Sequence, residues 1–427
     1  MRILVVGGGG REHALGAALA GHGHELRFAP GNAGTDGLAG PGAHANRPVR
    51  ADDVAGLVGL ALAEGVDLVV VGPEAPLVAG LVDALESRGI AAFGPTAACA
   101  ALEGSKAYAK QLMARWGVPT AASVTVNRLE DALAALDRFD AVPVVKASGL
   151  AAGKGVVVPE HRADAEAALG AMFVERVFGD AASEVVLEER LVGREVSVLA
   201  ICSDASYRLL VPAQDHKRLL DGDGGPNTGG MGAFAPSAIV DDTLLGTIGE
   251  LAIAPILDGM VRDGTPYCGV LYAGIMLTDA GPRVLEYNCR FGDPEAQVIL
   301  ALWADDPVHI FRAAIERELD QVTLSWRPGA AATVVMAAEG YPERPVSGAL
   351  IGGLEAAAAT GCQVLHAGTV SSPEGPRVAG GRVLSVTATG ADLPAAVNRV
   401  YAGVDRISFD GMQFRRDIGR HNPEVTA

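Results

Sequence analysis

The stretch "KASGLAAGKGVVV", residues 146–158, decides what kind of fold this sequence predicts. A Walker-type phosphate loop has four residues between its first glycine and a Gly-Lys pair, continues with Ser or Thr, and opens a helix. Here three residues separate Gly149 from Gly153, and neither Ser nor Thr follows Lys154. The β-branched run that comes next predicts a strand, not a helix. We therefore expect a glycine loop between two strands, with backbone N–H groups and nearby lysines facing a phosphate chain.

Composition narrows the class of protein. The 427 residues are 49% hydrophobic and 20% charged, which is typical of a globular chain of about three domains. Lys and Arg number 34 against 51 Asp and Glu, and the net charge of −17 argues against a nucleic-acid or anionic membrane partner. Five scattered cysteines without CxxC spacing, and a first strand in place of a signal peptide, favour a reduced cytoplasmic protein. A monomer is the default expectation.

The pattern of apolar runs divides the chain into four sections. Short apolar runs alternate with helical stretches at the start, which predicts a parallel, Rossmann-like sheet. Strand-rich sequence with the glycine stretch follows, then a section with long strands and an apolar helix, and finally a small α/β unit. The expected boundaries are 1–100, 101–193, 194–326 and 327–427.

The first motif, "VVGGGGREHAL", reads as a strand, a glycine turn and a helix whose N-terminus faces an anion. A dinucleotide fingerprint would need a third glycine where Glu12 stands, and an acid at the end of the second strand. That strand runs into "APGNAGT" instead. A smaller phosphorylated ligand held by Gly9, Gly10 and Asn32 fits better, although plain tight turns remain an alternative.

The segment "VGPEAPLVAG" places Glu74 just after a predicted parallel strand. Ligands bind at the carboxyl edge of such sheets, so Glu74 is a candidate for orienting a sugar hydroxyl or an amine. A turn-forming Pro-Glu pair explains the stretch equally well.

The carboxyl cluster in "VLEYNCRFGDPEAQ" predicts a metal site. Glu286 and Asn288 lie two apart in an extended run, so both side chains point to one face. Hard oxygen ligands of this kind, completed by phosphate oxygens and waters, suit Mg²⁺. Arg290 shares that face if the strand continues, where it would stabilise charge on a transferring phosphoryl group. An edge strand with outward polar residues is the alternative.

Two further segments carry candidates. The strand in "VVLEERLVGREVS" exits into a linker with Glu188, Leu191 and Glu195, which suits an adenine edge and a ribose, although such acids are often merely solvated. "QDHKRLLDGDGGPNTGGMGA" reads either as a lid that closes over reactive intermediates or as a solvated loop. His216, within it, has no assigned role.

Taken together, ten motifs give a resemblance over almost the whole chain. In order they are "GGREHAL", "PGNAGT", "VGPEAPLV", "GPT", "LEGSK", "GLAAGKGV", "QDHKR", "GPNTGGMGA", "LEYNCRFGDPE" and "HAGT". The sequence resembles the phosphoribosylamine–glycine ligase family, also called glycinamide ribonucleotide synthetases. The resemblance implies a two-part ATP-grasp domain in which ATP lies between two α+β subdomains, with the glycine stretch as a lid.

The resemblance also implies a reaction and a role for each matching residue. ATP, glycine and 5-phosphoribosylamine would give glycinamide ribonucleotide through glycyl phosphate, with Mg²⁺ or Mn²⁺ as cofactor. The nucleotide would be held by Lys106, Lys146, Gly153, Lys154, Gly155, Glu188, Leu191 and Glu195, and the metal by Glu286 and Asn288. Catalysis would fall to Arg290, Lys217 and Asp215, and the ribose phosphate part to Gly9, Gly10, Asn32 and Glu74, while Asp293 would bind a substrate.

Two residues depart from the family's pattern, and three other functions compete. Ser148 stands where the family usually has Asp, and Gly8 where Asn or Ser is usual. A different ATP-grasp ligase would have no reason to carry "PGNAGT" and "VGPEAP". A nicotinamide-dependent oxidoreductase is disfavoured by Glu12, and a nucleotide sensor could have lost Glu286, Asn288 and Arg290, all of which are present.

Overall fold

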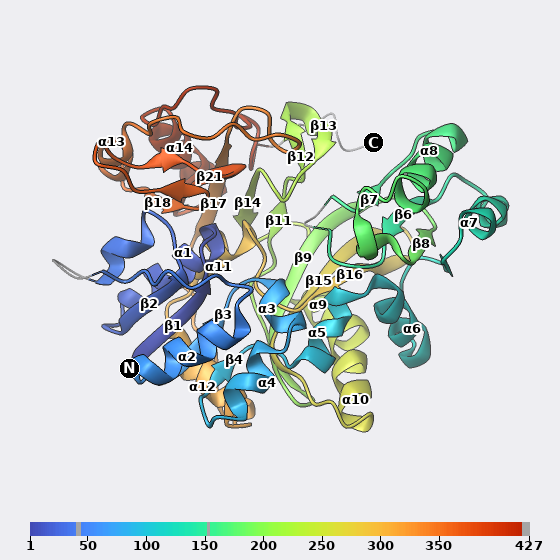
Figure 1. The fold of residues 1–427 in the computed structure, drawn as a ribbon, viewed down its shortest axis with the longest axis horizontal. Helices are drawn as coiled ribbons and strands as arrows, with labels where there is room; N and C mark the ends of the chain where they lie inside the picture. The colour runs from blue at the N-terminus through green and yellow to red at the C-terminus, as the bar shows by residue number, and fades with distance from the viewer. Residues whose placement is uncertain (40–43, 152–153, 421–427) are drawn as a thin grey trace.

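The N-terminal region is built on a parallel sheet. The computed structural model describes residues 1–39, 44–151 and 154–420. Its first four strands are β1 (Arg2–Gly7), β2 (Glu25–Pro30), β3 (Leu68–Val71) and β4 (Ala92–Phe93), in the order β2-β1-β3-β4. Every pair is parallel, and the crossovers include α1 (Gly10–Ala20), α2 (Val54–Glu64) and α4 (Leu81–Glu86). Helices on both faces explain why the two central strands are almost continuously apolar. The predicted parallel sheet is confirmed (Figure 1).

The middle of the molecule is an antiparallel sheet of long strands. It consists of β9 (Arg194–Ser203), β10 (Ser206–Leu209), β15 (Cys268–Thr278) and β16 (Gly281–Asn288), in the order β10-β9-β15-β16. A helical run, α9 (Asp242–Ile248), η5 (Gly249–Ile253) and α10 (Ala254–Arg262), packs against it.

This helical run is 21 residues long and contains an 18-residue window with a mean hydropathy of 1.5, so by length and composition alone it could cross a membrane. Its buried side chains include Ile248, Ile253, Ile256 and Leu257, which belong to the hydrophobic cluster of the central sheet. Packing against that sheet accounts for the apolar face of the helix.

The glycine stretch lies in a separate small sheet. This sheet has the order β5-β8-β6-β7, with β5 (Ser123–Val126), β6 (Val144–Ala147), β7 (Val156–Val157) and β8 (Val185–Glu188). Helices α7 (Leu129–Ala135) and α8 (Arg162–Phe173) pack with it. Lys146 pairs with Val156 in the antiparallel ladder of β6 and β7, so the stretch joins two antiparallel strands, as predicted. Gly153 lies outside the described residues.

The C-terminal sheet contains strands from two parts of the sequence. Its order is β11-β14-β17-β21-β18, with β17 (Ala330–Ala337), β18 (Gln363–His366) and β21 (Arg382–Gly390) near the C-terminus. The other two strands, β11 (Gln214–Asp215) and β14 (Gly232–Ala235), precede residue 327. The sheet therefore draws on the section 194–326 as well, while the four sequence boundaries stay predictions. Helix α14 (Leu393–Val404) packs against it.

Shorter elements complete the described chain. They are η1 (Thr35–Ala39), α3 (Glu74–Val78), α5 (Ala97–Gly104), α6 (Lys106–Trp116), η2 (Leu136–Arg138), η3 (Gly179–Ala182), β12 (Arg218–Leu220), η4 (Asp221–Asp223), β13 (Gly224–Asn227), α11 (Glu295–Leu302), α12 (Pro307–Ile315), η6 (Leu319–Gln321), α13 (Leu354–Ala358), β19 (Thr369–Val370) and β20 (Arg377–Val378).

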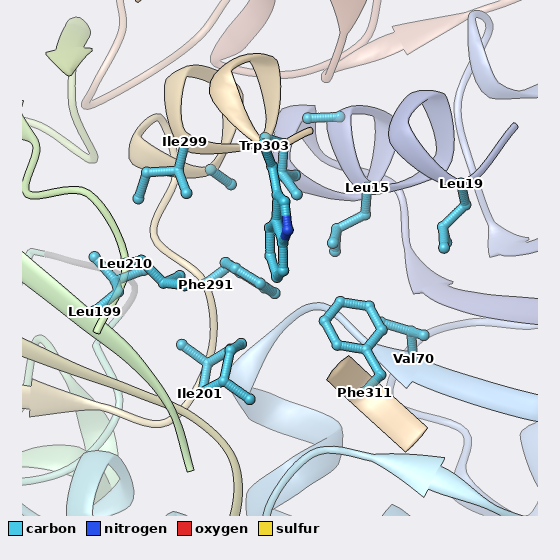
Figure 2. Close-up of a cluster of buried hydrophobic side chains, with 14 of the residues drawn as sticks. Leu15, Leu19, Val70, Leu199, Ile201, Leu210, Phe291, Ile299, Trp303 and Phe311 are labelled. Atoms are coloured by element: carbon cyan, nitrogen blue, oxygen red, sulfur yellow. The ribbon is translucent and has the colours of Figure 1, made fainter. Parts of the chain in front are cut away.

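One hydrophobic core joins the N-terminal sheet to the central sheet. Phe311 of α12 is fully buried and stacks on Phe93 with ring centroids 4.1 Å apart, and Trp303 meets it edge-on. Figure 2 shows Trp303 between Phe291 and Leu15 of α1, with Phe311 below them beside Val70. Because interiors are close-packed, this shared core holds the loops of the two sheets in a fixed relation.

A buried histidine pair joins the N-terminal region to the C-terminal sheet. The backbone N–H of His366 donates to Nδ1 of His13 at 2.9 Å, and the centroids of the two rings lie 5.8 Å apart. Burial lowers the pKa of His13 to about 3, with His366 contributing, and lowers the pKa of His366 to about 4. Both rings are therefore neutral at pH 7.

This pair predicts acid sensitivity. Unfolded histidine takes up a proton near pH 6.5, whereas these two do so near 3 and 4, so the unfolded state binds more protons between those values. The free energy of unfolding should fall as the pH drops below about 6.5, by about 2 kcal/mol per histidine at pH 5. Urea unfolding at pH 7 and pH 5 measures it.

The matched variants are His13→Asn, whose amide oxygen can replace the Nδ1 acceptor, and His22→Asn, which changes an exposed histidine. The first should make the pH dependence shallower by about one proton, and the second should leave it unchanged. An unaltered slope in His13→Asn would contradict the explanation.

Candidate active site

Two lysines and one carboxylate link the glycine-stretch sheet to the central sheet. Lys146 Nζ lies 3.0 Å from Glu188 Oε2 and donates to the carbonyl oxygen of Leu285 at 3.3 Å. Lys110 Nζ lies 3.2 Å from the same Glu188 oxygen. The carboxylate is thus engaged by two ammonium groups, and the adenosine contact predicted for Glu188 stays a prediction. Lys110 was missed, although it lies one helical turn after Lys106.

The other predicted nucleotide residues lie on α6, in the glycine stretch and after β8. Lys106 begins α6, and its Nζ donates to the carbonyl oxygen of Gly149 at 3.3 Å. Burial lowers the pKa of Lys106 and nearby Lys146 adds to this, while Glu286 opposes it. Lys154 is exposed, Gly155 is buried and accepts the N–H of Ala147 at 2.8 Å, and Leu191 lies half-buried between β8 and β9.

The predicted metal residues lie on β16, as expected from their spacing. Glu286 pairs with Gly274 of β15, and Asn288 pairs with Tyr272, so both side chains lie on one face. Burial pushes the pKa of Glu286 upward, but Lys217, Lys146, Lys106 and Arg290 together hold it below its usual range. The carboxylate is therefore ionised within a set of cations.

A divalent cation fits this pair only with further oxygen ligands. Within the described part of the chain, no group of three or more His, Cys, Asp or Glu side chains is placed to hold a metal. Glu286 and Asn288 offer a carboxylate and an amide oxygen, the hard donors that Mg²⁺ prefers. Oxygens of a nucleotide and water would have to complete the coordination shell.

Arg290 lies just past the end of β16 and is framed by carboxylates. Its Nη2 is 2.8 Å from Glu103 Oε1 and 3.1 Å from Asn288 Oδ1, and its Nε is 3.5 Å from Glu74 Oε2. Burial alone would lower the pKa of Arg290, but Glu103 and Glu74 raise it. Among the described residues, Arg290 Nε has no hydrogen-bond partner. The contact of Nε with Glu74 is thus an ion pair without hydrogen-bond geometry.

Glu103 is a residue that the sequence reading missed. Its Oε2 accepts the backbone N–H of Cys289 at 2.7 Å. One carboxylate therefore contacts both the backbone of Cys289 and the side chain of Arg290, just past the end of β16. Burial raises the pKa of Glu103, while Arg290 opposes that shift. The only signal in the sequence was its place in "LEGSK".

Asp215 and Lys217 lie at the edge of the C-terminal sheet and face the central sheet. Lys217 pairs with Glu195 of β9, and burial lowers its pKa less than Glu195 and Asp215 raise it. Burial raises the pKa of Asp215, with Glu295 and Glu195 adding and Lys217 opposing. Lys217 therefore contacts one carboxylate and lies near a second, and the catalytic roles predicted for Asp215 and Lys217 stay predictions.

The segment after Lys217 is a paired hairpin in this structure. Strands β12 and β13 pair antiparallel, and Arg415 Nη1 donates to Asp223 at 2.7 Å. The N–H of Thr228 donates to the carbonyl oxygen of Lys217 at 2.7 Å. The motion expected of a lid stays a prediction.

Glu12 occupies the glycine turn at the start of α1. The N–H of Gly9 donates to Glu12 Oε2 at 2.6 Å, and a Cβ on Gly7 would lie 2.6 Å from Glu12 Cγ. The Glu12 side chain therefore fills the turn and takes a backbone donor that a dinucleotide pyrophosphate would need. Because Glu12 occupies this donor, the phosphate contact predicted for Gly9 stays a prediction.

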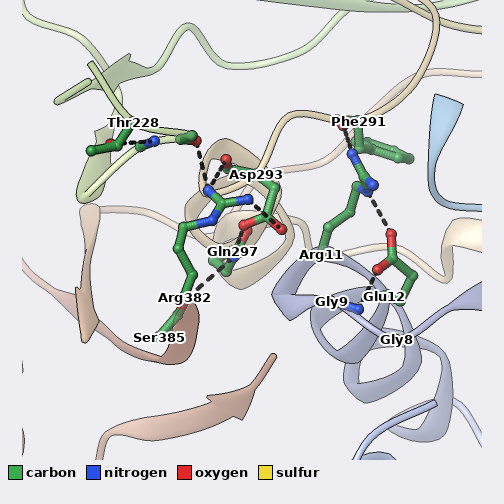
Figure 3. A network of polar contacts seen from close by, with 12 residues as sticks. Gly8, Gly9, Arg11, Glu12, Thr228, Phe291, Asp293, Gln297, Arg382 and Ser385 are labelled. Carbon is green, nitrogen blue, oxygen red and sulfur yellow. Dashed lines mark hydrogen bonds and ion pairs between the residues drawn. The ribbon is translucent and has the colours of Figure 1, made fainter. Parts of the chain in front are cut away.

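Asp293 lies beside the same turn and is held from two sides, as Figure 3 shows. Gln297 Nε2 donates to it at 2.8 Å, and Arg382 Nη2 lies 3.3 Å away. Burial would raise the pKa of Asp293, but Arg382 and Arg11 hold it below its usual range. A Cβ on Gly9 would lie 3.4 Å from Asp293 Oδ2, so the two predicted residues are neighbours.

Arg382 was also missed by the sequence reading. From β21 it donates to the carbonyl oxygens of Gly229 and Asp293, both at 2.6 Å (Figure 3). It thus connects the C-terminal sheet, the hairpin segment and the Asp293 turn. No motif marks it, because its partners lie far away in the sequence.

Asn32 and Gly8 shape the neighbouring turn. Asn32 Nδ2 donates to the carbonyl oxygens of Gly8 and His366, and its Oδ1 accepts the N–H groups of Gly34 and Thr35. A Cβ on residue 8 would lie 2.4 Å from the carbonyl oxygen of Gly31. Glycine at position 8 is thus explained by close packing, while the predicted ligand contact of Asn32 stays a prediction.

Comparison with known proteins identifies first the class and then the family. The fold is similar to that of the biotin carboxylase domain of 2-oxoglutarate carboxylase from Hydrogenobacter thermophilus, with a TM-score of 0.72 at 17% identity over 97% of this chain and 91% of that one. Residues 104–296 match the family described as phosphoribosylglycinamide synthetase, ATP-grasp (A) domain, so this is an ATP-grasp enzyme. Residues 1–103 and 331–421 match the N and C domains of the same synthetase.

Full-length relatives agree with these matches. A phosphoribosylamine–glycine ligase from Mesorhizobium japonicum is 46% identical over 98% of both chains. The trifunctional purine biosynthetic protein adenosine-3 of Gallus gallus is 46% identical over 98% of this chain, which spans 42% of that protein. The crystal structure of phosphoribosylamine–glycine ligase from Thermotoga maritima has a TM-score of 0.83 at 33% identity, over 98% of this chain and 100% of that one. The chain belongs to the phosphoribosylamine–glycine ligase family.

Proposed function

We propose that this chain ligates glycine to 5-phosphoribosylamine with ATP, giving glycinamide ribonucleotide, ADP and phosphate in de novo purine biosynthesis. One observation of the site carries the chemistry: cations border the Glu286–Asn288 pair, with Lys146 Nζ 3.3 Å from the carbonyl oxygen of Leu285 and Arg290 Nη2 3.1 Å from Asn288 Oδ1. Such a set of cations beside a pair of oxygen ligands suits a triphosphate and its metal. The relatives, named for this reaction, match over 98% of the chain.

The proposed chemistry has two steps. A carboxylate oxygen of glycine attacks the γ-phosphorus of ATP, the bond to the β-phosphate oxygen breaks, and ADP leaves. The amine of phosphoribosylamine then attacks the carbonyl carbon of glycyl phosphate. Phosphate leaves with the former carboxylate oxygen, and the nitrogen loses a proton as the amide forms. Activation is needed because a free carboxylate offers an amine no leaving group.

The residues divide between these steps. Lys106, Lys146 and Lys154 would hold ATP phosphates, and Leu191 and Glu195 would contact adenosine. Mg²⁺ or Mn²⁺ held by Glu286 and Asn288 would neutralise phosphate charge. The magnesium ADP complex of the Hydrogenobacter domain supports a metal in this fold. Arg290, beside Asn288 at the end of β16, would stabilise the transferring phosphoryl group or hold glycine's carboxylate.

At the other end, the ribose phosphate part would lie near Gly9, Gly10, Asn32, Glu74 and Asp293. Asp215 and Lys217 would line the junction between the two halves. A monomer, a cytoplasmic location and the absence of nucleic-acid and membrane partners stay predictions from the sequence.

Arg382 offers a test of the acceptor end. Arg382→Gln would free Asp293, which Arg382 holds through both its carboxylate and its carbonyl oxygen. We expect the KM for phosphoribosylamine to rise about tenfold, since a charge-assisted contact is worth about 1.5–3 kcal/mol, with the KM for ATP within about twofold of wild type. Arg377→Gln, which removes an arginine paired with Glu374 elsewhere in the same region, is the control. Equal effects on both substrates would contradict the assignment.

The proposal itself is tested by ADP release with ATP, Mg²⁺ and glycine, with and without phosphoribosylamine formed from ribose 5-phosphate and ammonia. Steady ADP release that requires both substrates, together with a new glycinamide ribonucleotide, is the expected result. ATP binding without turnover would move the function to a different acceptor or to a nucleotide sensor.

A further inference from the structure

The start of helix α6 is held largely by one residue that lies outside it. The N–H of Lys106 donates to the carbonyl oxygen of Ser148 at 2.8 Å, and the N–H of Ala107 donates to Ser148 Oγ at 3.1 Å. The third N–H, of Tyr108, donates to Ser105 Oγ at 3.1 Å. The first N–H groups of a helix have no partner within it. Ser148 therefore satisfies two of the three with its backbone and its side chain.

Ser148 is itself fixed from the other side. Only 4% of it is exposed, and its N–H donates to the carbonyl oxygen of Glu184 at 3.0 Å. The next residue, Gly149, donates its N–H to the carbonyl oxygen of Ala181 at 2.8 Å. The entry of the glycine stretch is thus fastened both to α6 and to the segment that leads into β8.

Lys106 and Lys146, the two lysines at the proposed phosphate site, belong to the two elements that Ser148 joins. Lys106 is the first residue of α6, and its Nζ returns to the carbonyl oxygen of Gly149 at 3.3 Å. Lys146 lies two residues before Ser148, on β6. Ser148 therefore connects the helix that carries one ammonium group to the strand that carries the other.

We propose that Ser148 is a positioning residue for nucleotide binding: by joining the N-terminus of α6 to the end of β6, it sets the position of Lys106 relative to Lys146. It touches no substrate. The proposal rests on the proposed function, in which these lysines hold ATP phosphates. Loss of the hydroxyl leaves the buried N–H of Ala107 without an acceptor, so the first turn of α6 shifts and Lys106 moves with it.

The first test is the pair Ser148→Ala and Ser148→Asp. Alanine removes the acceptor of the Ala107 N–H. We expect the KM for ATP and the Kd for MgADP to rise roughly three- to tenfold, with kcat changed less than about twofold. Aspartate supplies another acceptor at a helix N-terminus, so it should restore most of the affinity and keep turnover. Ser148→Cys fills the same space with a weak acceptor and should resemble alanine, which guards against misfolding of one variant.

A control separates positioning from stability. Asp392→Ala removes the side-chain cap of α14, where Asp392 accepts the N–H of Ala395 at 2.8 Å in the C-terminal region. It should lower the free energy of unfolding by a similar amount without changing the Kd for MgADP. A rise in Kd in Asp392→Ala equal to that in Ser148→Ala would overturn the proposal.

The decisive test is a double-mutant cycle with Lys106→Met. If Ser148 acts through Lys106, adding Ser148→Ala to Lys106→Met should change the Kd for MgADP by less than about twofold. Fully multiplicative effects would refute the proposal. Because MgADP binding needs neither glycine nor phosphoribosylamine, a wild-type chain that binds it without forming an amide would contradict the proposed function and leave this cycle readable.

Discussion

Glu286→Gln is expected to lower kcat for ligation by at least about a thousandfold, equivalent to about 4 kcal/mol of transition-state stabilisation. Glutamine keeps the shape of the side chain but removes the negative charge that faces Lys217, Lys146, Lys106 and Arg290. It also removes the carboxylate that would hold a divalent cation beside the phosphates. Steady-state measurement of ADP and amide formation with saturating ATP and metal gives kcat directly.

The control is Asp279→Asn, an exposed residue in the turn between β15 and β16 on the same hairpin. It changes the charge by the same amount and should leave kcat within about twofold of wild type. If Glu286→Gln kept more than about a tenth of wild-type kcat, Glu286 could not be the metal ligand on which the reaction depends.

Glu188→Ala is expected to lower the free energy of unfolding by about 3–5 kcal/mol, which is the usual cost of leaving a buried charge without its partner. Glu188 is 2% exposed, and its carboxylate lies 3.0 Å from Lys146 Nζ and 3.2 Å from Lys110 Nζ. Burial already lowers the pKa of Lys110, with Glu188 opposing that shift. Removing Glu188 therefore leaves two buried ammonium groups without the carboxylate that they contact. Urea unfolding at pH 7 measures the loss.

Glu189→Ala provides the matched comparison, since this neighbouring glutamate is exposed and accepts one N–H, that of Ala122, at 3.3 Å. Its substitution should cost less than about 1 kcal/mol. Equal losses for the two variants would show that the contact with Lys146 and Lys110 is not what stabilises this sheet.

The parts of the fold that local patterns determine could be predicted. The β-branched run after the glycines gave the strand β7, and the spacing of Glu286 and Asn288 placed both on one face of β16. These inferences rest on the period of two in a strand, which needs no knowledge of distant contacts. The same is true of the parallel sheet, whose buried strands are short and almost wholly apolar.

The parts that depend on long-range contacts could not be predicted from residues alone. Arg290 falls past the end of β16, and its partner Glu103 is 187 positions earlier in the numbering of the chain. Arg382 of the C-terminal sheet forms an ion pair with Asp293, which lies in a different predicted section of the chain. Nor does any pattern reveal that the Glu12 side chain turns back into the glycine loop. Such roles come from tertiary packing, which short motifs do not encode.

The central claim, that ATP activates the carboxylate of glycine, is tested most directly by following the oxygen atoms. Glycine labelled with a heavy oxygen isotope in its carboxylate would be incubated with ATP, Mg²⁺ and phosphoribosylamine, and the phosphate released would be examined by mass spectrometry. We expect one labelled oxygen in the phosphate for each amide formed, because phosphate leaves with that carboxylate oxygen. Amide formation with unlabelled phosphate would contradict a glycyl phosphate intermediate and, with it, the proposed mechanism.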